Sequence, residues 1–377
     1  MQLISGHDAK ALRLRLLLGV LTLAPCVAQA APAYSIIDLG TLGVSSVGYG
    51  INAAGQVTGY SLIAGDATNH AFVSTSSGLK DLGTLGGSSS AGVGINAAGQ
   101  VAGYSSTVGD AATHAFVSTS SGLKDLGTLG GSNSAGYGIN AAGQVTGYSY
   151  VSFGVVHAFV STSSGLKDLG TLGGTNSYGY GINDASQVTG QSDISSGASH
   201  AFVSTNTGLT DLGTLGGSDS RSLGINAAGQ VTGYSYVVGD VAVHAFVSTS
   251  SGLKDLGTLG GSVSKGQGIN AAGQVTGGSY LLGDAALDAF LYDGTAMYDL
   301  NALILPDSGW YLKTGFAIND SGQITGDGVI NGQIHAFLLT PAAVNSVPEP
   351  ASLVMLGVGL LATGAALRRR RHAALDD

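Results

Sequence analysis

Short runs in which apolar and small polar residues alternate recur along most of this chain, separated by turns rich in glycine. In a sample unit, the runs cover residues 133–140, 144–150, 157–162 and 166–172. Alternation with a period of two predicts half-buried β-strands, because successive side chains of a strand point to opposite faces. Since only short turns separate the runs, this unit predicts a four-stranded antiparallel meander.

The turns between the first two runs of each unit share one pattern, with Asn first and, in all but one copy, Gly last. This arrangement is typical of a type I hairpin turn. The seven copies are residues 52–55, 96–99, 140–143, 183–186, 226–229, 270–273 and 319–322. The repeated turn predicts that every unit has the same hairpin at the same place.

The triplet His-Ala-Phe opens the third run and recurs at an almost fixed spacing. Its copies begin at His70, His114, His157, His200, His244, Asp288 and His335, so Asp replaces His once. The gaps are 44, 43, 43, 44, 44 and 47 residues. A period in the forties built from short strands is typical of propeller blades or solenoid coils, whose units bury their faces against their neighbours.

The order of the runs indicates how the two ends of the repeat region meet. The fourth, Asp-Leu type of run occurs seven times; the first copy, residues 35–42, precedes any complete unit, and the last unit stops at residues 335–341 without one. A ring must pair its first strand with its last, whereas an open solenoid caps its ends with atypical units. We therefore expect residues 31–341 to form an all-β, seven-bladed β-propeller of four-stranded antiparallel blades, closed by the N-terminal strand. The alternative is a β-solenoid.

Composition agrees with an all-β chain, since there are 63 glycines and only 10% charged residues.

Residues 1–30 are typical of a secretory signal peptide, with a basic start, an apolar stretch and a cleavage site at Ala28 and Ala30. The only cysteine, Cys26, lies within this segment, so we expect no cysteine after cleavage.

The other end carries a second targeting pattern after a short linker, 342–347. Residues 351–367 are apolar or small and reach about 25 Å as a helix, so they predict a short transmembrane span that engages the inner membrane transiently. The flanking residues are Pro348, Glu349, Pro350, Arg368, Arg369, Arg370 and Arg371. This order resembles the PEP-CTERM sorting signal of Gram-negative bacteria, over residues 348–377. The resemblance implies an exosortase as partner and delivery to the cell surface, outer envelope or extracellular matrix.

The combined repeat also resembles a known group of proteins. A His-Ala-Phe strand, a Gly-Ile-Asn hairpin and an Asp-Leu-Gly strand alternate from about residue 34 to 341. This constellation is similar to the HAF-repeat family of bacterial extracellular proteins. The resemblance implies export and assigns no catalytic activity.

The repeated polar residues suggest structure rather than chemistry. Equivalent positions of a seven-membered ring lie roughly 10 Å or more apart, too far for metal bonds of about 2 Å, so we expect no metal site and no cofactor. Each His is expected to bond neighbouring backbone or the Asp of its own blade. The Gly-Asp loops at Asp66, Asp110, Asp240 and Asp284 are interpreted as turns, with a weak Ca²⁺ contact as the alternative.

The composition of residues 31–347 gives little support for catalysis or for nucleic-acid binding. Residues 31–347 contain no Glu, and no nucleophile motif is present, so we expect no enzyme; the alternative is an extracellular propeller enzyme that cleaves polysaccharide through Asp residues. The same region has 7 Lys plus Arg and 19 Asp, a formal charge of 7 − 19 = −12. This charge repels phosphate and argues against nucleic acid.

The departures from the repeat are the candidate binding residues. Residues 300–315 are longer than the equivalent links and hold Trp310 and Tyr311, while Arg221 is the one basic departure between the fourth and fifth units. Aromatic clusters bind sugars and proteins well, although a packing role for the two aromatics is the alternative. We expect an exported, non-enzymatic binding or structural module of the envelope or exopolysaccharide matrix, with polysaccharide or surface proteins as partners.

Overall fold

The computed structural model describes residues 34–65, 68–205 and 207–342, all within the unit that contacts delimit as Pro32–Asp377. The predicted signal peptide and the predicted sorting signal with its span lie outside the described residues. Within the described residues, no helix has the length and apolar character needed to cross a membrane. Strands dominate this part of the chain, which confirms the all-β prediction.

The strands pair into antiparallel sets of four, in the order of the chain. The first three sets are β2 (Gly43–Ile51), β3 (Val57–Ile63), β4 (Asn69–Thr75) and β5 (Gly78–Asp81); β6 (Gly86–Ile95), β7 (Val101–Thr107), β8 (Thr113–Thr119) and β9 (Gly122–Asp125); and β10 (Ser134–Ile139), β11 (Val145–Ser152), β12 (Val155–Thr162) and β13 (Gly165–Asp168). Each set is a meander, as predicted.

The later sets repeat this pattern. They are β14 (Gly173–Ile182), β15 (Val188–Ile194), β16 (Ser199–Thr205) and β17 (Gly208–Asp211); β18 (Gly216–Ile225), β19 (Val231–Val237), β20 (Val243–Thr249) and β21 (Gly252–Asp255); β22 (Gly260–Ile269), β23 (Val275–Leu281), β24 (Leu287–Tyr292) and β25 (Met297–Asp299); and β26 (Trp310–Ile318), β27 (Ile324–Ile330) and β28 (Gln333–Pro341) with β1 (Tyr34–Asp38). The fifth and sixth sets share one sheet through a single parallel pairing, Val243 with Val263. Four short 3₁₀ helices link strands: η1 (Val108–Asp110), η2 (Val238–Asp240), η3 (Leu282–Asp284) and η4 (Leu300–Leu303).

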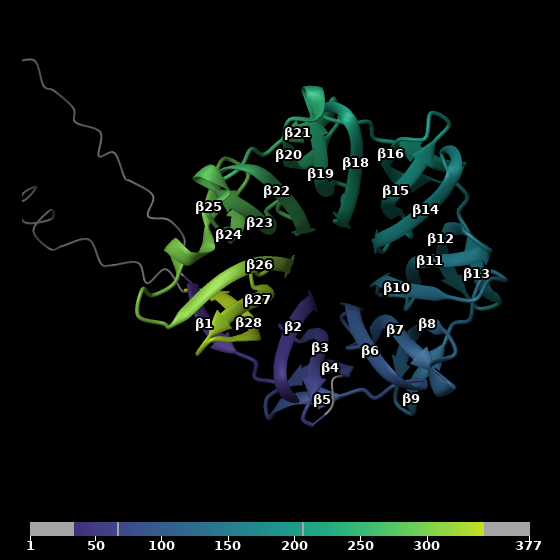
Figure 1. The fold of residues 1–377 in the computed structure, drawn as a ribbon, viewed down its shortest axis with the longest axis horizontal. Coiled ribbons are helices and arrows are strands. Elements are labelled where there is room, and N and C mark those ends of the chain that lie inside the picture. The colour runs from purple at the N-terminus through teal and green to yellow at the C-terminus, as the bar shows by residue number, and fades with distance from the viewer. Residues whose placement is uncertain (1–33, 66–67, 206, 343–377) are drawn as a thin grey trace, which may run out of the picture. The chain divides into compact units, whose positions relative to one another are not determined.

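The sets follow one another around a central axis, with β2, β6, β10, β14, β18, β22 and β26 innermost (Figure 1). Each of these first strands contacts the first strand of the next set, and β26 contacts β2 in turn. The N-terminal strand β1 pairs antiparallel with β28, so that Tyr34 lies opposite Pro341 and Asp38 opposite Phe337. The last set is thereby completed by the start of the repeat region, as the order of the runs predicts.

The fourth strand of each set is shorter than predicted. The run 166–172 ends as a strand at Asp168, and the run 35–42 ends at Asp38. The cause is the Asp side chain itself: the Oδ1 atom of Asp168 accepts a hydrogen bond of 2.7 Å from the backbone N–H of Gly170, which has a φ of 71°. This turn leads the chain out of one set and into the next.

The core lies between neighbouring sets. In β4, Ala71 packs with Phe116 and Val101 of the next set, whereas Phe72 packs with Ala336 of the preceding set. Consecutive side chains of a strand point to opposite faces, so each Phe from one set meets a small Ala from its neighbour. The seven Phe side chains are fully buried: Phe72, Phe116, Phe159, Phe202, Phe246, Phe290 and Phe337. The triplet therefore encodes the contact between blades.

Seven buried asparagines link all the sets through hydrogen bonds, and we call them the asparagine belt. Each side-chain N–H donates to the backbone carbonyl of the equivalent Asn in the next set at 3.0–3.3 Å. The donors are Asn52, Asn96, Asn140, Asn183, Asn226, Asn270 and Asn319, and the last donates to Asn52. The hydrogen bonds thus return to their starting point, which an open solenoid could not do.

Candidate binding face

The repeated histidines form pairs within their own sets. Each Nδ1 atom lies 2.7–2.9 Å from an Asp oxygen on the fourth strand of the same set, as between His70 and Asp81. In the last set, His335 pairs with Asp38 of β1, which attaches the N-terminal strand by a side chain as well as by its backbone. Among the described residues, no three His, Cys, Asp or Glu side chains gather closely enough to hold a metal ion.

The Asp side chains of the described Gly-Asp loops stabilise the local backbone. Asp110, Asp240 and Asp284 adopt a positive φ of 55–56° and accept a hydrogen bond from the backbone N–H of a Ser in the first strand of the same set. For Asp110 and Asp284, this N–H is the largest cause of a lowered carboxyl pKa. These side chains act as turn residues, while Asp66 lies outside the described residues.

The sixth set departs from the His–Asp pattern because Asp288 takes the place of His. Asp288 is buried, and its Oδ1 atom accepts a hydrogen bond of 2.6 Å from the Tyr311 hydroxyl. Its neighbour Asp299, which accepts from the backbone N–H of Asn301, has a raised pKa, first through burial and also through the charge of Asp288. Two carboxyl groups therefore interact where the other sets hold a hydrogen-bonded His–Asp pair.

Of the three predicted binding residues, the structure places Trp310 and Tyr311 at the start of β26. Trp310 is partly buried and packs edge-on against Phe337, with 6.1 Å between ring centroids, and Tyr311 bonds Asp288. Arg221 lies on β18, in a different part of the molecule. The three residues do not share one site, and the contacts of the two aromatics fit the packing alternative.

Three positions near the central axis are not the same in all sets, although their neighbours repeat. They lie on the first two strands, and we call them the variable face. The two on the first strand carry several residue types, and the one on the second strand is Tyr in four sets and Gln, Gly or Asp in the others. In chain order, the sets contribute Val47, Tyr49 and Tyr60; Ala91, Val93 and Tyr104; Ala135, Tyr137 and Tyr148; Tyr178, Tyr180 and Gln191; Arg221, Leu223 and Tyr234; Lys265, Gln267 and Gly278; and Thr314, Phe316 and Asp327. A position-by-position comparison of the copies would have found this signal in the sequence.

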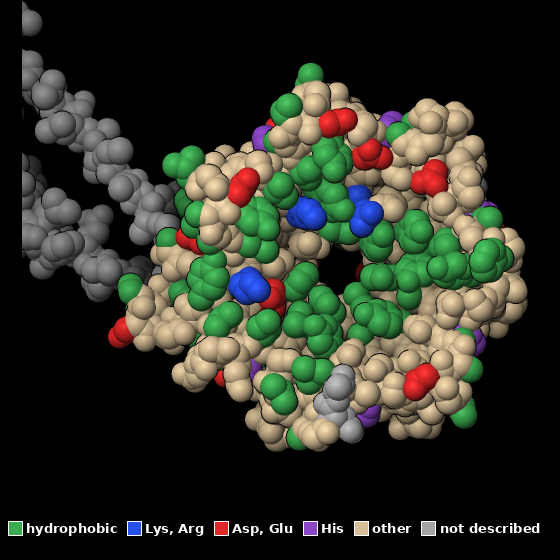
Figure 2. All heavy atoms as spheres, in the orientation of Figure 1, with side chains coloured by type: hydrophobic (Ala, Val, Ile, Leu, Met, Phe, Trp, Pro, Cys, Tyr) green, Lys and Arg blue, Asp and Glu red, His purple; other side chains and the backbone are tan. Residues whose placement is uncertain are grey.

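The variable face is aromatic on one side and cationic on the other. Ring contacts run from set to set, with centroids 5.2 Å apart for Tyr137 and Tyr180 and again for Tyr148 and Tyr178. Figure 2 shows hydrophobic side chains around the central opening, with Lys and Arg side chains gathered to one side of it. Burial raises the pKa of Tyr180 to about 12, so its hydroxyl stays protonated and can donate hydrogen bonds at neutral pH.

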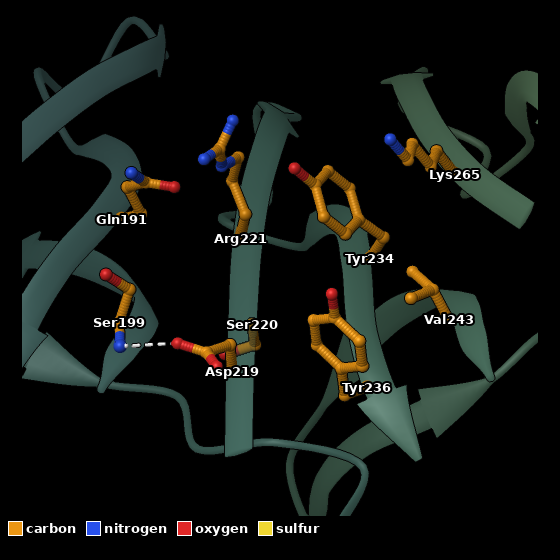
Figure 3. A pocket seen from close by; sticks show the side chains of 9 residues that line it. All are labelled: Gln191, Ser199, Asp219, Ser220, Arg221, Tyr234, Tyr236, Val243 and Lys265. Atoms are coloured by element: carbon orange, nitrogen blue, oxygen red, sulfur yellow. Dashed lines mark hydrogen bonds between the residues drawn. The ribbon is translucent and has the colours of Figure 1, made fainter. Parts of the chain in front are cut away.

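A pocket of about 340 Å³ opens beside Arg221, and we call it the cationic pocket (Figure 3). Its lining residues come from the fourth, fifth and sixth sets: Gln191, Ser199, Asp219, Ser220, Arg221, Tyr234, Tyr236, Val243 and Lys265. The Arg221 guanidinium carbon lies 5.8 Å from the Tyr180 ring centroid and 5.6 Å from that of Tyr234. Lys265 Nζ lies 4.8 Å from the Tyr234 centroid, so both cations share one ring.

An equivalent pocket of about 420 Å³ lies between the second and third sets, and we call it the neutral pocket. It is lined by Tyr104, Thr113, Asn133, Ser134, Ala135, Tyr137, Tyr148 and Tyr150. Ala135 stands at the position of Arg221, and Asn133 at that of Asp219. The molecule therefore contains two versions of one pocket, one charged and one uncharged.

Comparison with solved structures supports the propeller fold. The β-propeller domain of the Trilobed protease from Pyrococcus furiosus, described as having an open velcro topology, is 8% identical with a TM-score of 0.54, covering 79% of this chain and 96% of that one. TolB from Acinetobacter baumannii is 11% identical with a TM-score of 0.43; the match covers 64% of each chain, less than two thirds of TolB's length. With the antiparallel sets of four strands, the first similarity places the described unit in the class of β-propellers.

The C-terminus supplies the other match. Residues 346–371 match the PEP-CTERM protein-sorting motif, which confirms that prediction for residues that lie outside the described ones. The motif implies an exported protein that is sorted by an exosortase, and it indicates export to the cell surface in Gram-negative bacteria. No curated protein matches the chain.

Proposed function

We propose that the chain is an exported, non-enzymatic, seven-bladed β-propeller that serves as a binding or structural module of the cell envelope or exopolysaccharide matrix. The observation that carries this proposal is the variable face, because the copies diverge there while neighbouring positions on the same strands repeat. Residues that only build the scaffold have no reason to differ between sets. The similarity to HAF-repeat proteins agrees with an extracellular role.

The type of residue on this face favours sugars as ligands. Tyrosines offer rigid apolar area for the faces of sugar rings together with a hydroxyl for hydrogen bonds. Tyr60, Tyr104 and Tyr148 occupy the same position in three consecutive sets, so they offer similar contacts at a regular spacing. A repeating polymer could use several of these positions at once, which strengthens binding without any single strong contact.

A glycan-binding array with the purified full chain tests this proposal. Binding to glycans, weakened by the combined substitution of Tyr60, Tyr104 and Tyr148 by Ala, is the expected result. Absence of binding to any glycan, together with absence of retention on isolated matrix material, would contradict it. A matched control is the substitution by Ala of three exposed threonines at the ends of the third strands, Thr75, Thr119 and Thr162.

The competing proposal is an extracellular enzyme that cleaves polysaccharide through Asp residues. Asp288 and Asp299 of the sixth set are the pair that favours it, since their carboxyl groups interact and one has a raised pKa. Incubation with a panel of bacterial polysaccharides, followed by assay for new reducing or unsaturated ends, separates the two proposals. We expect no new ends; their appearance, and their loss in Asp288→Asn, would establish the enzyme.

Processing at both ends belongs to the same proposal. Residues 1–30, with cleavage after Ala30, and the segment from Pro348 to the arginines 368–371 are expected to be removed during delivery. Intact-mass measurement of the protein recovered outside the cell checks this. Released protein that still carries the C-terminal arginines would be inconsistent with exosortase processing.

A further inference from the structure

We propose that the cationic pocket binds a carboxylated sugar, such as a uronic acid residue within an acidic polysaccharide. This inference rests on the proposed role in glycan binding and narrows it to one ligand class at one site. It is carried by the position of the cations, by the packing of Arg221, by the polar groups at the other end of the pocket, and by the contrast with the neutral pocket.

The positions of the cations do not follow from the fold. Of the seven Lys and Arg between residues 31 and 347, four occupy the repeated Gly-Leu-Lys sequence of the fourth strand, on the outer side of their sets. The other three, Arg221, Lys265 and Lys313, stand on first strands at or beside the variable face. Among the described residues, the Asp side chains that form close pairs with a basic side chain all pair with His, so neither Arg221 nor Lys265 has a carboxylate in direct contact. Two cations over one ring, neither in a salt bridge, are available to a negatively charged ligand.

The packing of Arg221 prepares it for such a ligand. The flat guanidinium is held between the Tyr180 and Tyr234 rings, and its Nε atom is buried without a hydrogen-bond partner among the described residues. The two Nη atoms of Arg221 are not among the buried unpaired atoms, so they are the donors that a ligand can reach. A guanidinium already fixed in one plane loses little freedom when it binds the two oxygens of a carboxylate.

The other end of the pocket suits hydroxyl groups. The Asp219 carboxylate accepts from the Ser199 backbone N–H at 2.8 Å and from the Ser218 hydroxyl at 2.6 Å, and it still has free acceptor capacity towards the pocket. In Figure 3, Arg221, Tyr234 and Lys265 lie at one end, with Asp219 and Tyr236 at the other. A uronic acid carries its carboxylate at one end and donating hydroxyls at the other. A ligand with a second carboxylate at that end of the pocket would meet the negative charge of Asp219.

Size and surface agree with this class of ligand. A volume of about 340 Å³ falls within the range of small-molecule pockets. Tyr236 is 37% exposed and provides an apolar surface for the face of a sugar ring. The pocket is open at the variable face, so a bound residue can belong to a longer polymer whose neighbouring sugars contact further tyrosines.

The test uses the purified full chain and isothermal titration with three probes: a short oligogalacturonate, the same oligosaccharide fully methyl-esterified, and polyglutamate. We expect binding to the oligogalacturonate, at least about tenfold weaker binding to the ester, and weak binding to polyglutamate. Arg221→Ala should weaken oligogalacturonate binding at least about tenfold, because this change removes a charge-assisted bidentate contact. Lys124→Ala, which removes an exposed charge from an outer strand, should change binding by less than about twofold.

Two features keep the test decisive. Ala already stands at the position of Arg221 in two other sets, as Ala91 and Ala135, so Arg221→Ala is compatible with the fold. Arg221→Lys, which keeps the charge and loses the planar fork, should bind with intermediate affinity. Equal binding by Arg221→Ala and Lys124→Ala, or equal binding of the ester and the acid, would overturn the inference.

The remaining outcomes separate the inference from the proposed function. If the chain binds neutral glycans but not the oligogalacturonate, the inference is wrong and the glycan-binding proposal stands. If polyglutamate binds as tightly as the oligogalacturonate and competes with it, the site takes acidic peptides and the inferred ligand class is wrong. If no glycan of any kind binds, both proposals fail together.

Discussion

The asparagine belt directly follows the first strands, which carry two of the three positions of the variable face, and the two regions follow opposite rules. At the belt, all seven sets have the same residue making the same bond to the next set. A few residues earlier, at the positions of Arg221 and Lys265, the sets carry Val, Ala, Tyr or Thr instead. The contrast separates the residues that hold the sets together from those that are free to change.

The physical cause of the contrast is the buried hydrogen bonding of the belt. Each Asn of the belt is buried, and the loss of one would leave backbone groups of two sets without partners, which is unfavourable in the interior. Arg221 is only partly covered and Lys265 is exposed, and replacing either side chain leaves no backbone group unpaired. Selection can therefore vary this face without affecting closure.

The largest effect is expected at the junction between the ends. A chain that begins at Gly43 lacks β1, so β28 is left as an unpaired edge, His335 loses Asp38, and the buried Tyr34 is gone. We expect a loss of roughly 5 kcal/mol or more in the free energy of unfolding, with aggregation through the open edge. Thermal unfolding of this chain and of one that begins at Pro32 measures the loss of stability. Equal melting temperatures and equal cooperativity for the two chains would show that β1 does not complete the last set.

The belt itself gives the next largest effect. Asn96→Ala should lower the free energy of unfolding by roughly 3 kcal/mol, because it removes four hydrogen bonds and leaves buried groups unpaired. Asn319 makes the same four contacts, but its inter-set bond to Asn52 crosses the junction between the ends. Denaturant unfolding should give equal losses in the free energy of unfolding for Asn96→Ala and Asn319→Ala. A clearly smaller loss for Asn319→Ala would mean that the belt is not closed.

The sixth set gives a smaller effect that depends on pH. Because the pKa of Asp299 is raised in the folded protein, the stability linked to this group is present below the ordinary Asp pKa and is lost as the pH rises through the raised value. Asp288→Asn removes one cause of the shift and keeps an acceptor for Tyr311. The variant should be more stable than the unmodified chain at neutral pH, by up to about 1 kcal/mol, and the difference should vanish in acid. Melting curves recorded from neutral pH down to acid pH check this prediction, with the exposed Asp307→Asn as the control. A stability difference that persists in acid would contradict the claim that the charge of Asp288 raises the pKa of Asp299.

The smallest effect on stability is expected at the variable face. Arg221→Ala loses two cation–π contacts and also removes a buried, unpartnered Nε atom, so the two consequences oppose each other. We expect a change within about 1 kcal/mol of zero, measured by denaturant unfolding. A loss as large as that of Asn96→Ala would place Arg221 among the scaffold residues and weaken the distinction between the two regions.

Much of the fold follows from the sequence because its causes are local or repeated. Alternation predicts the strands, the Asn-to-Gly turns predict the hairpins, and the surplus Asp-Leu run predicts that β1 pairs with β28. The His–Asp contact could also be anticipated, since both residues recur in register within each unit. The prediction that failed concerns strand length, because Asp168 ends β13 through its own side chain, a local bond that alternation does not report.

The site was only partly visible in the sequence. Arg221 was recognised as a departure from the repeat, but Tyr180, Tyr234 and Lys265 lie 13 to 44 residues from it along the chain and belong to three different sets. Trp310 and Tyr311, the other candidates, pack into the last set and against the sixth.

The sequence by itself determined the strand pattern, the repeat, the order in which the ends meet and the sorting signal, because each of these depends on residues close together or on simple periodicity. Only the tertiary structure decided which departures from the repeat lie side by side. The sets pack face to face around an axis, so residues about one repeat apart become neighbours, and small Ala and Gly positions between them set how closely they approach. The cationic pocket is a product of that packing, in which two cations from adjacent sets meet over one tyrosine ring.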